Sequence, residues 1–391
     1  MASEIESYLR DVIDPEKPRK GLLPGLLRPA LRGLSGVYGH GLSAYLAAEK
    51  IGARRRERLP VPVLSIGNLA VGGTGKTPMT AMVCRGLAAR GLRAAILSRG
   101  HGGDSLDVRV VSEGNGRVLL TAAEAGDEPV LLARSCRHTP VLVGKDRRQS
   151  GREALRRWGL DLLVLDDGFQ YWQLARDLDV VLLDSLLPFD NGHALPRGLL
   201  REPPENLRRA GMVVVTRAGR LARDGEDPAL RREELIERIH RYAPGIPVYF
   251  ADHEPQCFVA QGHAGPIEEP LNLVSGVRVV AVSAIAQPAS FHETLTAAVD
   301  CHIAECVTKD DHGEFGQADV DRIYETVIRT GAQAVVITEK DAVKWPRDLW
   351  PETVPVYALR IAMTVENEDA FFADILARTA AAQPQSAGDG R

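Results

Sequence analysis

The sequence predicts an α/β protein built on a doubly wound, mostly parallel sheet, followed by a second, smaller α/β domain. Short runs rich in Val, Ile and Leu alternate with helix-like stretches, which is the pattern of buried parallel strands covered on both faces. A Gly-rich loop ending in Lys-Thr follows the first of these runs. The length of 391 residues suits two domains at roughly 100–200 residues each.

The N-terminal segment 1–50 has a different character. Leu, Ala, Val and Tyr dominate residues 21–50, and basic side chains flank them at Lys17, Arg19 and Lys20 and at Arg54–Arg56. An apolar helix with cationic flanks suits the plane of a membrane interface. The same composition also suits an amphipathic helix packed on the domain with a solvated basic edge, and the composition alone does not choose between these two interpretations.

The first α/β domain is predicted over residues 51–245. Lys76–Arg90 reads as its first helix. The predicted strands are 61–68, 94–100, 139–144, 161–167, 179–184 and 212–217. Such continuous apolar runs, separated by helical stretches, indicate parallel strands buried on both faces.

The second α/β domain is predicted over residues 246–378. Its predicted strands are 246–252, 277–288, 302–308, 334–341 and 354–361. The last segment, 379–391, is rich in Ala, Gln, Gly and Pro, which predicts a disordered tail.

Composition excludes several classes of protein. A net charge of -4 does not favour nucleic acid as a partner. The five cysteines are scattered without a CxxC pair, which argues against a disulfide framework or a zinc site. No run of 18 apolar residues predicts a transmembrane helix, and the polar N-terminus does not resemble a secretory signal.

The run VLSIGNLAVGGTGKTP carries the strongest local signal. Glycines allow successive backbone N–H groups to turn toward phosphate oxygens, and the following helix adds the partial positive charge of its N-terminus. Lys76 is expected to reach the terminal phosphates of a nucleotide, and the Thr77 hydroxyl to bind Mg²⁺. The predicted nucleotide-binding residues are Gly72, Gly73, Thr74, Gly75, Lys76 and Thr77. Ala70 stands where the common pattern has Gly.

A second acidic site is expected at Asp166 and Asp167, which follow the apolar run of 161–167. In phosphate-loop enzymes an Asp at the end of a neighbouring strand holds the metal. The carboxyl ends of parallel strands are also where open α/β sheets bind ligands. The sequence therefore predicts ATP and Mg²⁺ as cofactors, with Thr77, Asp166 and Asp167 as metal ligands.

Taken with the phosphate loop, the runs SRGHGG, GDEPVLLA, LDDGFQ, NGHALPRGLLREP and TEKDAVK resemble the tetraacyldisaccharide 4'-kinase family. These motifs keep the family's order over roughly residues 55–345. The resemblance implies transfer of the γ-phosphate of ATP to the 4'-hydroxyl of a tetraacylated glucosamine disaccharide 1-phosphate in lipid A biosynthesis. It further implies a peripheral enzyme at the cytoplasmic face of the inner membrane, attached to an anionic surface through its N-terminal segment.

The resemblance also implies catalytic roles. Asp127, in GDEP, falls on the family's proposed base, and His312, in Asp311–His312, on the histidine partner of that base. A carboxylate suits this role because it can accept the hydroxyl proton as the new P–O bond forms. His312 belongs to the predicted second domain, so this reading expects the active site between the domains.

Four further side chains are expected to contact substrate: Arg99, Arg147, Gln170 and Arg201. Guanidinium groups suit both the donor phosphates and the 1-phosphate of the acceptor. The expected partners are the lipid-linked disaccharide and the membrane surface, and the expected state is a monomer. The alternative function is a P-loop ATPase that acts as a nucleotide-gated switch at the membrane.

Overall fold

The computed structural model describes residues 8, 12–13, 21–50, 56–100, 107–222, 225–262, 265–310 and 313–380. The chain divides into two compact units, each assembled from separated segments. The first unit comprises Met1–Lys76, Asp161–Asp252 and Val365–Arg391, and the second comprises Thr77–Leu160 and His253–Thr364. The contiguous domains expected at 51–245 and 246–378 stay a prediction, and so does the disordered tail, because 381–391 lie outside the described residues.

The first unit contains a parallel sheet in the order β5-β1-β6-β7-β8. Its strands are β1 (Val63–Asn68), β5 (Leu162–Asp166), β6 (Leu178–Asp184), β7 (Met212–Thr216) and the first part of β8 (Val248–Gly262). Every residue of the first four is buried, as the continuous apolar runs predict.

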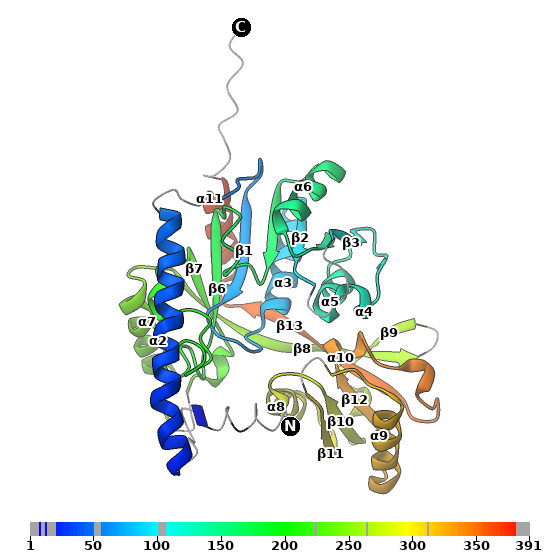
Figure 1. The fold of residues 1–391 in the computed structure, drawn as a ribbon. Coiled ribbons are helices and arrows are strands. Elements are labelled where there is room, and N and C mark those ends of the chain that lie inside the picture. The colour runs from blue at the N-terminus through cyan, green and yellow to red at the C-terminus, as the bar shows by residue number, and fades with distance from the viewer. Residues whose placement is uncertain are drawn as a thin grey trace. The chain divides into compact units, whose positions relative to one another are not determined.

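Helices cover both faces of this sheet (Figure 1). Helix α7 (Pro228–Tyr242) buries Leu235 and Ile239 in one core together with Phe250 of β8. Tyr249, next to Phe250, contacts Phe371 of α11 (Glu368–Ala380), with 5.2 Å between the ring centroids. Successive side chains of a strand point to opposite faces. The doubly wound arrangement predicted from the sequence is therefore confirmed.

Helix α2 (Leu22–Lys50) also belongs to the first unit. Its Ser35 hydroxyl donates to the Ala194 carbonyl at 2.7 Å, and its Tyr38 hydroxyl donates to the Arg201 carbonyl at 2.8 Å. Leu42 is buried, whereas Leu26 and Val37 are exposed. The predicted N-terminal amphipathic helix is therefore present and is attached along one edge.

The second unit contains two groups of strands. The first is β2 (Ala94–Ser98), which pairs in parallel with β4 (Pro140–Val143), while β3 (Arg109–Glu113) pairs with β4 in antiparallel fashion. The helices around this group are α3 (Lys76–Ala89), α4 (Ala122–Ala125), α5 (Asp127–Ser135) and α6 (Arg147–Arg157).

The second group is the parallel set β11 (His302–Thr308), β10 (Arg278–Ser283), β12 (Ala334–Thr338) and β13 (Val356–Val365). Two helices cover opposite faces of these strands (Figure 1): α9 (Gln317–Thr330) packs with Val280 and Val335, and α8 (Pro288–Ala298) packs with Val279 and Val336. A short helix, α10 (Glu339–Ala342), directly follows β12.

Two strands were not predicted, and two others, β8 and β13, were predicted to end too early. β3 and β9 (Gly265–Glu269) carry polar residues at antiparallel positions, so neither shows the apolar run that marks the parallel strands. Strand β8 runs on past residue 252 to Gly262, where it pairs with β9. The remaining short helices are η1 (Pro204–Arg209), η2 (Ala218–Arg220), η3 (Leu271–Val274) and η4 (Arg347–Leu349).

Candidate active site

The phosphate loop connects the buried end of β1 at Asn68 with the start of α3 at Lys76. Gly72 and Gly75 have φ angles of 124° and 85°, a region that side chains disfavour and glycine adopts readily. Ala70 is absent from the positive-φ residues and forms a bridge with Leu200. The backbone at this position therefore does not require the glycine of the common pattern.

Polar side chains of the same unit hold the loop. The Asn68 side-chain amide donates to the Thr74 hydroxyl at 2.9 Å, and the Thr216 hydroxyl donates to the Thr74 carbonyl at 3.1 Å. Arg217 donates to the Gly73 carbonyl at 3.0 Å. Because the C=O and N–H of one peptide point in opposite directions, the bond to the Thr74 carbonyl turns the N–H of Gly75 away from Thr216.

Arg217 is itself fixed from several sides. It forms an ion pair with Asp184 at the end of β6, and its backbone carbonyl accepts a hydrogen bond from the Ser185 hydroxyl at 2.6 Å. Its side chain is 9% exposed, and its φ of 59° is unusual for a residue with a β-carbon. Such a backbone conformation persists only where the surroundings determine it. Asp184 and Arg217 therefore form a rigid support behind the loop.

Lys76 and the acidic pair lie at one edge of the sheet. The Lys76 Nζ is 3.8 Å from Asp167 Oδ1, and Arg201 Nη1 is 2.9 Å from each Asp167 oxygen. Asp166 is 2% exposed and pairs in register with Ile66 of β1. The structure thus brings together three residues predicted as separate motifs: Lys76, Asp167 and Arg201.

The turn after the acidic pair leaves no room for a side chain at Gly168. A Cβ there would lie 2.6 Å from Leu165 Cβ and 2.7 Å from Ser65 Oγ. Asp167 adopts a φ of 49° just before it. The Asp167 carboxylate, at the start of this closely packed turn, contacts both Lys76 and Arg201.

Gln170 and Glu202 extend the network. Gln170 Nε2 donates to the Asn68 carbonyl and to Glu202 Oε1, both at 3.0 Å, and Arg201 donates to Gln170 Oε1 at 3.2 Å. Glu202 is fully buried and accepts from Arg209, whose guanidinium lies 4.4 Å over the Phe169 ring. Burial lowers the pKa of the Arg209 guanidinium, and the Glu202 carboxylate opposes that shift.

The segment before Glu202 runs alongside the start of the phosphate loop and is joined to it by main-chain hydrogen bonds. The Val71 N–H donates to the Leu199 carbonyl, and the Arg201 N–H donates to the Leu69 carbonyl, both at 2.7 Å. The motif NGHALPRGLLREP therefore places Arg201 and Glu202 beside the loop through main-chain hydrogen bonds.

Asp127 belongs to the second unit, where it is the first residue of α5. Gly126 before it has a φ of 92° and ends α4 as α5 begins. The Asp127 carboxylate lies 3.2 Å from Lys344 Nζ. Acidic residues in the first turn of a helix interact favourably with the helix dipole. His312 and Asp311 lie outside the described residues, so the predicted dyad stays a prediction.

The two remaining predicted arginines also lie in the second unit. Arg99 is exposed immediately after β2. Arg147, the first residue of α6, is 6% exposed and donates to the Lys145 carbonyl at 3.4 Å. Their roles as substrate contacts stay predictions.

Sequence reasoning missed several residues of these networks. Asp184 and Arg217 end the predicted strands 179–184 and 212–217, and Glu202 directly follows Arg201. Lys344 ends the quoted run TEKDAVK. Each of these residues could have been noticed as a charge at a strand end or within a recognised motif. The sequence does not show which distant residue it contacts.

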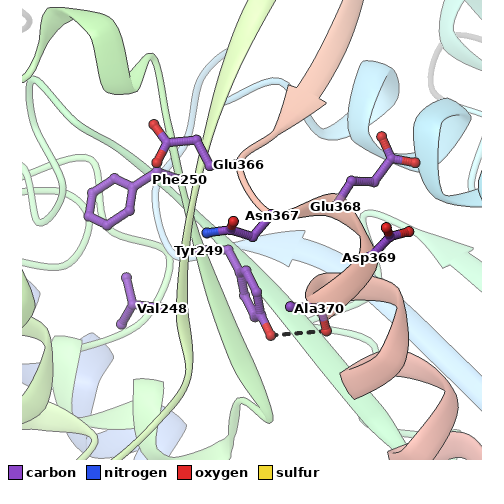
Figure 2. Close-up of a pocket in the computed structure, with 8 residues that line it drawn as sticks. All are labelled: Val248, Tyr249, Phe250, Glu366, Asn367, Glu368, Asp369 and Ala370. Atoms are coloured by element: carbon purple, nitrogen blue, oxygen red, sulfur yellow. Dashed lines mark hydrogen bonds between the residues drawn. The ribbon is translucent and has the colours of Figure 1, made fainter.

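A hollow of about 710 Å³ lies in the first unit between the start of β8 and the start of α11 (Figure 2). Figure 2 shows the Tyr249 hydroxyl directed toward the Ala370 carbonyl, at 3.3 Å, and Asp374 accepts from the same hydroxyl at 2.7 Å. Glu366 at its rim pairs with Arg232 at 2.5 Å. None of the predicted site residues lines this hollow, so we assign it no catalytic role.

Known proteins similar to this chain agree on one family. The family described as tetraacyldisaccharide-1-P 4'-kinase matches residues 27–380. A tetraacyldisaccharide 4'-kinase of Anaeromyxobacter dehalogenans is 45% identical over 81% of this chain and 77% of its own length. One of Syntrophus aciditrophicus is 38% identical, covering 81% and 84%.

A solved structure supports the fold. The LpxK protein of Aquifex aeolicus, crystallised in complex with ATP, aligns with a TM-score of 0.69 and 26% identity. The alignment covers 90% of this chain and 99% of the Aquifex chain. The chain therefore belongs to the tetraacyldisaccharide 4'-kinase family.

Proposed function

We propose that this protein transfers the γ-phosphate of ATP to the 4'-hydroxyl of a tetraacylated glucosamine disaccharide 1-phosphate. The observation that carries this proposal is the loop Gly72–Lys76, held in place by Asn68, Thr216 and Arg217 with Lys76 facing Asp167. Phosphoryl transfer depends mainly on positioning and on electrostatic stabilisation of the phosphoryl oxygens. A preformed loop with a fixed ammonium group supplies both.

Each residue has a defined role in this proposal. The loop N–H groups and Lys76 bind the terminal phosphates, and Arg201, oriented by Asp167, adds a second cation near them. Asp127 accepts the proton of the acceptor hydroxyl as the new P–O bond forms, while the bond to the leaving ADP breaks. Arg99 and Arg147 supply cations for the acceptor's 1-phosphate.

Mg²⁺ suits the oxygen donors predicted at the carboxyl end of β5 and at Thr77. Asp166 is a buried carboxylate in register with β1, and Asp167 and the Thr77 hydroxyl complete the predicted set. Mg²⁺ binds through one or two carboxylates together with substrate phosphates and water. When bound it would neutralise charge on the phosphate oxygens.

The proposed location is the cytoplasmic face of the inner membrane, with α2 in the interface. Four large apolar side chains of α2 are exposed: Leu23, Leu26, Leu34 and Val37. Their spacing places them on one helical face, beside the edge that carries Ser35, Tyr38 and Leu42. No helix in the described ranges is both long and apolar enough to cross a bilayer. A helix lying in the interface accounts for apolar side chains such as Val37, which is 70% exposed.

Vesicle binding tests the location. Asn at Leu26, Leu34 and Val37 together should reduce partitioning onto phosphatidylglycerol vesicles at least about tenfold, because apolar area no longer leaves water. Ile328→Asn on α9 is the matched control, since Ile328 is 64% exposed. Equal partitioning of the triple variant and the control would contradict the proposal.

Assay of the purified protein tests the reaction itself. With Mg-ATP and tetraacyldisaccharide 1-phosphate, we expect label from the γ-phosphate in the lipid and stoichiometric ADP. Release of free phosphate without labelled lipid would contradict kinase activity and favour a nucleotide-gated switch. The absence of nucleic acid partners and the monomeric state stay predictions.

A further inference from the structure

The motif TEKDAVK has a structural counterpart at the start of α5. Within the second unit, Lys344 Nζ lies 3.2 Å from Asp127 Oδ2, and Lys340 Nζ lies 4.0 Å from Glu128 Oε1. Two lysines of one motif, on and just after α10, therefore face the two acids of GDEP. Asp127 and Lys344 are 217 positions apart along the chain.

Lys344 is buried between two carboxylates. Its side chain is 7% exposed, and its Nζ lies 3.9 Å from Oδ1 of the fully buried Asp341. Asp341 is anchored from the backbone: its Oδ2 accepts from the Ala284 N–H at 3.0 Å and from the Thr338 hydroxyl at 2.7 Å. Its Oδ1 forms no hydrogen bond within the described residues. The Lys344 ammonium lies 3.9 Å from that oxygen, and Lys340 adds a further positive charge nearby.

This geometry differs from that of an ordinary surface ion pair. Exposed pairs contribute little because water screens them, and removing one leaves the partner solvated. Removing the ammonium of Lys344 would leave two acids without the cation between them, one of them fully buried. Burial already raises the pKa of Asp341, which shows how poorly its surroundings solvate a carboxylate.

We propose that Lys344, anchored by Asp341, is the positioning residue that orients the Asp127 carboxylate and keeps it charged for proton transfer. This inference rests on the proposed function, in which Asp127 accepts the hydroxyl proton. Lys340 pairs in the same way with Glu128, the residue next to Asp127. A residue that acts through the base should change turnover, while leaving the binding of ATP and acceptor in place.

Steady-state kinetics of full-length Lys344→Met and Lys344→Arg test the proposal. We expect Lys344→Met to lower kcat about 10- to 100-fold, part of the about 10²–10⁴-fold that a positioned base supplies. KM for ATP and for the acceptor should stay within about twofold, because no binding contact is removed. Lys344→Arg keeps the charge and should recover most of the lost kcat. Arg329→Ala, which removes an exposed pair with Glu305, is the control and should match wild type.

The Asp127→Asn background decides whether Lys344 acts through Asp127. There, Lys344→Met should lower kcat no further, because the group that it positions is already neutral. An equal further loss in that background, or wild-type kcat in Lys344→Met, would overturn the inference. Asp127→Asn alone with wild-type kcat would instead remove the base from the proposed function, and no labelled lipid with any variant would remove the kinase.

Asp341→Asn covers the case in which Lys344→Met does not fold. Asparagine retains an oxygen for the Ala284 N–H, while its amide NH₂ no longer attracts Lys344. We expect kcat to fall about 3- to 10-fold with KM values unchanged. Wild-type kcat in a folded Asp341→Asn protein, checked by thermal unfolding, would overturn the anchoring role.

Discussion

The phosphate loop and the start of α5 are both held by charged residues, but by different means. Behind the loop, Arg217 and Thr216 donate hydrogen bonds to backbone carbonyls of the loop, and the Arg217 backbone is itself held at a φ of 59°. At α5, the long side chain of Lys344 reaches the Asp127 carboxylate. The phosphate loop is thus held through its main chain, whereas the proposed base is paired through its side chain with the Lys344 ammonium.

The largest effect should come from Lys76→Ala, which removes the cation at the loop itself. We expect kcat to fall at least about 100-fold, because charge on the transferred phosphoryl group loses a fixed ammonium. Turnover at saturating ATP and acceptor measures the effect. Arg90→Ala, at an exposed position just after the same helix, is the control. Activity within twofold of wild type in Lys76→Ala would show that the loop does not bind the reacting phosphate.

Gly67→Ala tests how rigidly the main chain supports the loop. A Cβ at Gly67 would lie 2.6 Å from Phe169 Cβ and 2.8 Å from the Phe169 nitrogen, so β1 and the turn after β5 must separate. We expect a loss of about 1–3 kcal/mol in the free energy of unfolding, measured by denaturant titration. Gly33→Ala on α2 has no atom within 4 Å of its new Cβ and should not destabilise. Equal stability of the two variants would contradict a closely packed support.

Arg217→Lys separates the ion pair with Asp184 from the hydrogen bond to the Gly73 carbonyl. Lysine can retain the ion pair with Asp184 but lacks the second arm that donates to the Gly73 carbonyl. We expect about a tenfold weaker ATP affinity, the scale of one hydrogen bond to a charged group, with kcat at saturating ATP little changed. Equilibrium nucleotide binding and KM for ATP measure it. A fall in kcat with unchanged ATP affinity would show that Arg217, like Lys344, affects turnover and not nucleotide binding.

The smallest effect concerns stability alone and lies at the hollow of Figure 2. Burial and the hydrogen bond to Asp374 raise the pKa of Tyr249 to about 12. Because the folded pKa lies above the unfolded one, this stabilisation is present below pH 10 and is lost as pH rises toward 12. Solvent screening limits it to about 1 kcal/mol or less.

Tyr249→Phe removes the titrating hydroxyl. The difference in unfolding free energy between wild type and this variant should shrink between about pH 10 and 12. Unfolding in denaturant at several alkaline pH values measures that difference. A difference that does not change over this range would contradict the assignment, and kcat below pH 9 should be unaffected because none of the predicted site residues lines the hollow.

Much of the fold could be predicted because its strands are buried on both faces. The runs that became β5, β6 and β7 are apolar at all but one or two positions, so their composition alone marks them. β3 and β9 could not be found this way, because a half-exposed antiparallel strand of five residues leaves no such run. The Gly-rich loop was predictable because its amino acids and their spacing perform the binding locally.

The sequence by itself determined the local chemistry: the loop Gly72–Thr77, the acids that end β5, and the apolar helix α2. Glycine spacing and apolar runs are properties of neighbours along the chain, so composition and order suffice to predict a loop or a buried strand. Only the tertiary structure decided the partners, namely Arg217 behind Gly73, Glu202 beside Gln170 and Lys344 on Asp127. These contacts join residues 32 to 217 positions apart, and folding rather than spacing sets which charges meet.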